Sequence, residues 1–190
     1  MKNNQSVSKT VVGLLCLTGM LALAASAQAS VSYNQTIPYA TGTGNSTGGW
    51  TISSANGIDL SLRAQYNNTG LGAPLPSDIT PNDGNGTFTF GTGHSTRAQW
   101  EFWFDVNPGN TDTTGVIYNL AETGHNGVTI TLSDIANYFH DNGVNGTEFQ
   151  NAEDVGFSFL GFDPSVAGQY NIALTALDAN QRELNSVDMN

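Results

Sequence analysis

Basic residues are scarce in this sequence: five Lys and Arg stand against 16 Asp and Glu among 190 residues, for a formal net charge of −11. A protein that binds nucleic acid through its phosphates needs a basic surface, so partners of this class are excluded. Charged residues make up only 11% of the chain, whereas glycine occurs 22 times. This composition disfavours a coiled coil or a helical bundle, which are rich in charge and poor in glycine.

Cysteine is nearly absent too, since Cys16 is its one occurrence. The fold therefore cannot depend on internal disulfides, and no thiol remains if the N-terminal segment is removed. The sequence also has no G-x-S-x-G motif, and its three histidines are too widely spaced for a local zinc site: His94, His125 and His140. The signatures of several hydrolase classes are thus missing, and we expect no enzyme.

The first 29 residues have the organisation of a secretory signal peptide. Lys2 and Lys9 precede an apolar run over residues 11–25, and Ala27 and Ala29 flank Gln28 in an A-x-A cleavage pattern. The run is shorter than the roughly 20 residues that span a bilayer, which makes a retained membrane anchor the weaker alternative. We therefore expect cleavage after Ala29, no transmembrane segment in the mature chain, and a secreted or cell-surface location in a bacterium.

The remainder of the chain predicts β-structure. Apolar and polar residues alternate over residues 58–66, 100–106 and 170–176, and shorter strand patterns occur at 88–90, 116–120, 128–132, 157–159 and 187–189. Residues 30–49 predict an extended lead-in or an edge strand, and residues 133–138 the only helix. We expect an all-β domain over residues 50–190, a single antiparallel β-sandwich, immunoglobulin-like or jelly-roll, with at most one short helix.

The apolar phases of the clearest alternating patterns predict the centre of the core. This set consists of Trp100, Phe102, Tyr170, Ile172 and Leu174. Trp103 has the opposite phase, which predicts a large aromatic side chain on the outer face of a sheet. Exposed rings of this kind stack on sugars, so Trp103 is our candidate ligand-binding residue. The simpler interpretation is a central strand that is covered on both faces.

The residues that follow the aromatic strand are candidate metal ligands. Asp105, Asn107, Asn110 and Asp112 supply carboxylate and amide oxygens, which calcium prefers, and Asp105, Asn107 and Asp112 are the ligands that we assign. Their spacing is not that of an EF-hand, and the same residue types are usual in a solvated turn, which is the simpler interpretation. Calcium is the one cofactor that the sequence suggests, and none is required.

Three segments resemble a group of exported bacterial proteins that carry a PEP-CTERM sorting tail. These segments are GGWTISSANGIDLSLRA at residues 48–64, STRAQWEFWFDV at 95–106, and FQNAEDVGFSFLGFDP followed by GQYNIALTALDAN within 149–180. The resemblance covers most of the mature chain and implies an exported surface or matrix protein without catalytic residues. Family members end in a Pro-Glu-Pro motif, a hydrophobic helix and basic residues, so we expect this sequence to be cut short of that tail. Release without sorting is the alternative.

These observations favour an exported, non-enzymatic protein of the cell envelope or extracellular matrix, with envelope components or extracellular polysaccharide as partners. The alternative is a secreted carbohydrate-binding module, with or without calcium, which an exposed row of aromatic residues on one sheet face would favour. A glycosidase on a jelly roll is a third hypothesis. It would need two facing carboxyl groups, and only long-range folding could bring together the candidates Glu101, Glu122, Glu148 and Glu153.

Overall fold

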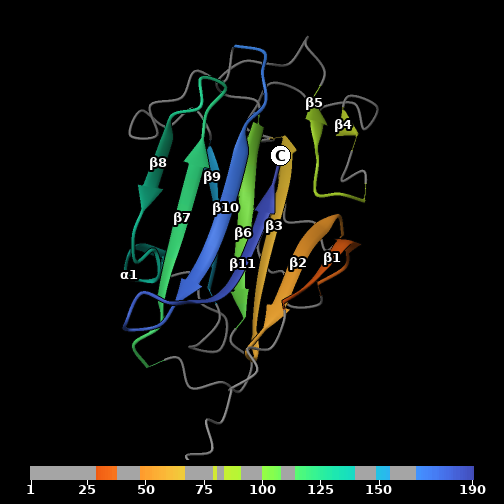
Figure 1. Ribbon diagram of the computed structural model, residues 1–190. Coiled ribbons are helices and arrows are strands. Elements are labelled where there is room, and N and C mark those ends of the chain that lie inside the picture. Colours follow the sequence, from red (N-terminus) through yellow and green to blue (C-terminus); the bar gives the residue numbers. More distant parts are fainter. Residues whose placement is uncertain are drawn as a thin grey trace, which may run out of the picture.

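The computed structural model describes residues 29–37, 48–66, 79–80, 84–90, 100–107, 114–139, 149–154 and 166–190, and these form an all-β sandwich of two antiparallel sheets (Figure 1). The expected fold class is confirmed. The five-stranded sheet has the order β1 (Ser30–Gln35), β2 (Trp50–Ala55), β3 (Ile58–Tyr66), β6 (Trp100–Asn107), β9 (Phe149–Asp154). The four-stranded sheet has the order β11 (Glu183–Met189), β10 (Asn171–Leu177), β7 (Ile117–Thr123), β8 (Thr129–Leu132).

Two smaller elements accompany the sandwich. β4 (Ile79–Thr80) and β5 (Thr89–Phe90) form a two-stranded sheet, and α1 (Ala136–Phe139) is a single helical turn. The helix begins later than the sequence predicts, because the backbone of residues 134 and 135 is bonded to β7 instead. Asp134 adopts a φ of 57°, its N–H donates to Asn119 Oδ1, and the Ile135 N–H donates to the Tyr118 carbonyl. In the described part of the chain no helix has the length and apolarity to cross a membrane.

The β2–β3 hairpin shows how local sequence sets the register of the five-stranded sheet. Its two-residue turn is Asn56-Gly57, with φ of 54° and 77°, and Ala55 pairs with Ile58. Positive φ at both turn residues is the geometry that matches the twist of a hairpin, and Asn-Gly tolerates it best. With this register, Leu60 and Leu62 of β3 lie on the face that packs against the second sheet.

The core lies between the two sheets and follows the predicted strand phases. Phe102, Ile172 and Leu174 belong to the buried cluster and Tyr170 packs against it half-buried, so four of the five expected core residues are confirmed. The fifth, Trp100, begins β6, but its side chain lies outside the described residues. Other large members of the cluster are Ile58, Leu60, Leu62, Phe104, Leu120, Ile135 and Met189.

The two sheets are offset sideways. β11, the edge strand of the four-stranded sheet, contacts β2 and β3, and β10 contacts β3. Among the described elements, no strand of the four-stranded sheet contacts β1 in this way, and in Figure 1 β1 is the outermost strand on the right. The five-stranded sheet therefore extends beyond its partner by one strand.

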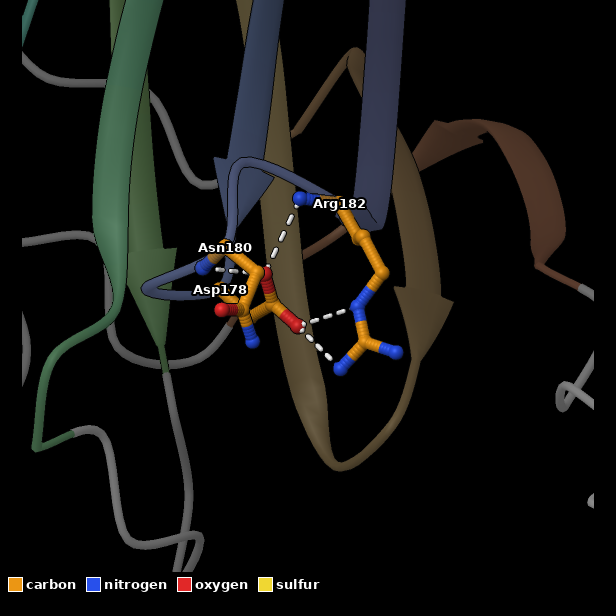
Figure 2. A network of polar contacts seen from close by, with 3 residues as sticks. All are labelled: Asp178, Asn180 and Arg182. Carbon is orange, nitrogen blue, oxygen red and sulfur yellow. Dashed lines mark hydrogen bonds and ion pairs between the residues drawn. The ribbon is translucent and has the colours of Figure 1, made fainter.

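The connection from β10 to β11 is closed by one carboxylate, as Figure 2 shows. Asp178 Oδ1 accepts hydrogen bonds from the N–H groups of Asn180 (2.8 Å) and Arg182 (2.9 Å), and Oδ2 accepts from the Arg182 guanidinium, with Nη2 at 2.7 Å. These contacts, led by the backbone N–H of Arg182, lower the pKa of Asp178. The carboxylate thus closes a tight turn between the two strands.

Candidate functional site

The candidate ligand-binding residue Trp103 lies on the outer face of the five-stranded sheet, on the opposite side from Phe102 and Phe104. In register it faces Arg63 of β3 and Ala152 of β9. Trp103 and Arg63 are both half-buried. An indole ring beside a guanidinium is a combination that can stack on a ligand and also donate hydrogen bonds to it.

Arg63 is held in place by the lead-in to β2. Its Nη1 donates a 2.6 Å hydrogen bond to the carbonyl of Gly48. Burial lowers the pKa of Arg63, but arginine titrates so far above neutrality that the group stays charged. The guanidinium therefore places a fixed positive charge on this face, in a chain that has few positive charges.

A row of three polar side chains crosses the same face, two residues along each strand from the row of Arg63, Trp103 and Ala152. Ser61 on β3, Asp105 on β6 and Gln150 on β9 are neighbours in register and are exposed by 0%, 0% and 5%. The Ser61 hydroxyl has no hydrogen-bond partner among the described residues. The outer face is therefore buried at these positions of its central strands, which agrees with the interpretation that the strand of Trp103 is covered on both faces. The residues that are buried there are polar.

Two of the three candidate metal ligands, Asp105 and Asn107, lie in strand β6 and not in a loop. Asp105 lies inside β6 and is fully buried, and Asn107 is the last residue of that strand, half-buried and opposite Asp59. Asp112, like Asn110, lies outside the described residues. Within the described ranges no group of three His, Cys, Asp or Glu side chains could hold a metal ion. The placement of Asp105 follows from the alternation of β6, because residues 103, 105 and 107 share one face.

Of the four glutamates considered for glycosidase chemistry, only Glu122 has a described side chain. It is fully buried on β7, in the same phase as Tyr118 and Leu120, and therefore projects between the sheets. Burial also raises the pKa of Tyr118 to about 12. Asp105, the other fully buried acid among the described side chains, lies on the outer face of the other sheet, so these two carboxyl groups do not face each other.

A polar contact that sequence reasoning missed joins the two sheets. Asn185 of β11 is 2% exposed, and its Nδ2 donates 2.8 Å hydrogen bonds to the carbonyls of Ser53 and Ile58. Its Oδ1 accepts a 2.7 Å bond from the Ser53 hydroxyl. One amide thus binds β2 and β3 at once. The signal was available in the sequence, because Asn185 interrupts the apolar phase that continues with Val187 and Met189.

The described histidine, His125, is also part of a structural contact. Its Nδ1 lies 3.3 Å from the hydroxyl of Tyr170, which itself donates a 2.8 Å bond to the Val166 carbonyl. Since the hydroxyl proton goes to that carbonyl, His125 Nδ1 is the donor in the contact with Tyr170. The chain bends closely over His125, and a Cβ added at Gly168 would lie 2.5 Å from the His125 Cβ.

Comparisons of the chain with models of known protein families, with curated proteins and with solved structures gave no match.

Proposed function

We propose that this chain is an exported, non-enzymatic protein of the bacterial cell surface or extracellular matrix. The observation that carries the proposal is that polar side chains of the described residues make contacts that hold the fold together. Asn185 joins the two sheets, Asp178 closes a turn and His125 holds Tyr170, so these groups stabilise the sandwich. The signal-like N-terminus and the resemblance to sorted bacterial proteins support export, and the acidic composition suits a protein that works in solvent outside the cell.

Expression of the full chain in a bacterium tests export directly. The protein recovered outside the cytoplasm should have lost residues 1–29 by intact-mass measurement, because the A-x-A pattern ends at Ala29. Replacing Ala27 and Ala29 by arginine should leave the uncleaved precursor with the cells. A full-length mass in the exported fraction of the unchanged protein would contradict the proposal.

A second candidate function, saccharide binding, is favoured by the pairing of Trp103 with Arg63 on the outer sheet face. A half-buried indole beside a fixed cation can stack on a sugar ring and bind its hydroxyl groups. Affinity electrophoresis in gels that contain single soluble polysaccharides would show retardation by at least one of them. Trp103→Ala should abolish the retardation, whereas Val128→Ala, which truncates an exposed apolar side chain outside the five-stranded sheet, should preserve it. Equal mobility of the unchanged protein in every gel would count against this candidate.

A further inference from the structure

β1 differs from the other strands of the two main sheets in one respect: each of its six residues is exposed. It is an edge strand, and within the described residues it pairs with β2 alone. Two large apolar side chains on it, Val31 and Tyr33, are exposed by 45% and 36%. An edge strand carries a row of backbone N–H and C=O groups that can pair with another strand.

The sideways offset of the sheets explains this exposure. Val31 pairs with Ser53, whose hydroxyl donates to Asn185 of β11. Val31 therefore lies on the inner face of the five-stranded sheet, the face that packs against β11 at β2 and β3. β11 covers β2 and β3, and β1 extends past it. One edge of the Tyr33 ring lies beside Gly86, where an added Cβ would come within 3.3 Å of the ring. The rest of the Tyr33 side chain and Val31 are open to solvent.

The sequence of β1 gives the edge little protection against pairing. Natural edge strands usually carry charges, proline or a bulge, and SVSYNQ has neither charge nor proline. The protection comes only at its end, where Asn34 adopts a φ of 55° and the register shifts between Ser32 and Gln35. Residues 31–33 thus form a short regular edge.

β1 has no charged side chains, and this bears on which kind of partner it can pair with. The chain has a net charge of −11, so a basic partner would be drawn to its acidic residues, and β1 has none of them. A second copy of the chain, in contrast, meets no charged side chain along this strand. Cleavage after Ala29 would leave an α-ammonium group at Ser30 of each copy, and with Ser32 on the axis these two groups lie at opposite ends of the paired strands. Antiparallel self-pairing is also complementary in side chains, because a two-fold axis at Ser32 sets Val31 opposite Tyr33 of the second copy, and Tyr33 opposite its Val31. Pairs of an aromatic with a β-branched residue are among the favourable cross-strand contacts.

We propose that two copies of this protein associate through β1, antiparallel, with Ser32 on the two-fold axis. The two five-stranded sheets then continue into one another, and the interface uses the same strand from both copies. The bulge at Asn34 limits the regular pairing to a few residues, which makes the association reversible. This self-association goes beyond the surface or matrix role proposed above and does not depend on it.

Sedimentation velocity of the purified exported protein tests the proposal, with a monomer–dimer equilibrium as the expected result. Tyr33→Lys removes both symmetry-related aromatic contacts and should weaken the dimer roughly tenfold. The control is Val128→Lys, at an exposed apolar residue outside β1 (54%), which should leave the dimer unchanged. A monomer at all concentrations, or equal weakening by both substitutions, would overturn the proposal.

Cysteine crosslinking tests the register without relying on affinity. In a Cys16→Ser background, Ser32→Cys would introduce the chain's one thiol. Directly opposite residues in an antiparallel pair have Cα atoms about 4.5–5.5 Å apart, within the roughly 4.4–6.8 Å that a disulfide spans. Mild oxidation should give a covalent dimer with Ser32→Cys and much less with Val128→Cys. A dimer that fails to crosslink at residue 32 would assign the contact to another surface and contradict the proposal, provided that circular dichroism shows both variants folded.

Discussion

Asn185 is one buried amide that binds two strands of the opposite sheet. Replacing it by alanine would leave the Ser53 hydroxyl and the carbonyls of Ser53 and Ile58 without these partners inside the protein. An unsatisfied buried polar group costs about 1–3 kcal/mol, so Asn185→Ala should lower the free energy of unfolding by roughly 2–4 kcal/mol. Urea denaturation at neutral pH measures this difference.

The matched control lies next to Asn185 on the same strand. Ser186 is half-buried and its hydroxyl donates to Glu183 near the surface, so Ser186→Ala should change stability by less than about 0.5 kcal/mol. A similar loss for the two variants would show that the amide does not carry the contact between the sheets.

Asp178 makes stability depend on pH in a definite direction. Its pKa in the folded protein is lowered, chiefly by the hydrogen bond from the Arg182 N–H, relative to about 3.9 in an unfolded chain. The stabilisation is therefore complete above the unfolded value and is lost as the pH falls through the lower folded value. Thermal melting of the wild type and Asp178→Asn should differ at pH 6 and converge towards pH 2. A difference that stays constant across this range would contradict the assignment.

At the residue scale the sequence predicted core positions better than polar ones. Phe102 and Leu174 follow from alternation, because burial depends on the phase of each strand. Asp105 belongs both to the alternating pattern of residues 100–106 and to the candidate metal ligands, and in the structure it continues the phase of Trp103 into the covered face. Its burial depends on what covers the sheet, and strand periodicity carries no information on this.

At the level of elements, the segment 166–170 is held against the turn between β7 and β8. Gly168 allows this approach, because any Cβ there would overlap His125. Gly168→Ala should therefore separate the two segments, break the contact between Tyr170 and His125, and cost roughly 1–3 kcal/mol. Urea denaturation gives the cost, and faster amide exchange confined to residues 124–128 and 166–170 would locate it.

Gly48→Ala is the control for this substitution. Its added Cβ would meet only the Thr36 hydroxyl, at 4.0 Å, and its φ lies outside the left-handed region. We expect its stability to stay within about 0.5 kcal/mol of the wild type. Equal effects of the two alanines would point to backbone entropy and away from the close approach at His125.

Strands with strict alternation were predicted most accurately. The pattern over residues 58–66 matches β3 residue for residue, and β11 contains the predicted residues 187–189. β9, with the sequence FQNAED, was missed because it is polar and amide-rich. The strand predicted at residues 157–159 lies outside the described residues. Edge strands such as β9 are stabilised by pairing with a neighbour, which a single-sequence pattern does not record.

For the whole molecule, the dominant electrostatic property is repulsion among acidic residues. Raising the ionic strength from about 0.01 M to 0.15 M shortens the screening length from about 30 Å to 8 Å, so the melting temperature should rise. Sodium, magnesium and calcium salts should act equally when ionic strength is matched. A larger shift with calcium, lost in Asp105→Asn or Asp112→Asn, would establish the metal site that the sequence suggested.

The sandwich class could be predicted for the whole molecule, because frequent short strands and turns without long helices allow few other architectures. The order of the strands could not be predicted, because it depends on pairings between strands that are distant in sequence, such as β3 with β6 and β10 with β7. Those pairings also bring Trp103, Arg63 and Ser61 together on one outer face, so this grouping could not be predicted from the sequence either.

The hydrogen bonds of Asn185 also have a consequence for the timing of folding. One of these bonds joins residues that are 132 positions apart in the sequence, and the other joins residues that are 127 positions apart. The contact between β11 and the β2–β3 hairpin therefore forms only when most of the described chain is present. Closing so long a loop is slow, and a partly emerged chain lacks the strand that joins the sheets. Among the described strands, the one that completes the sandwich is therefore also the last to arrive.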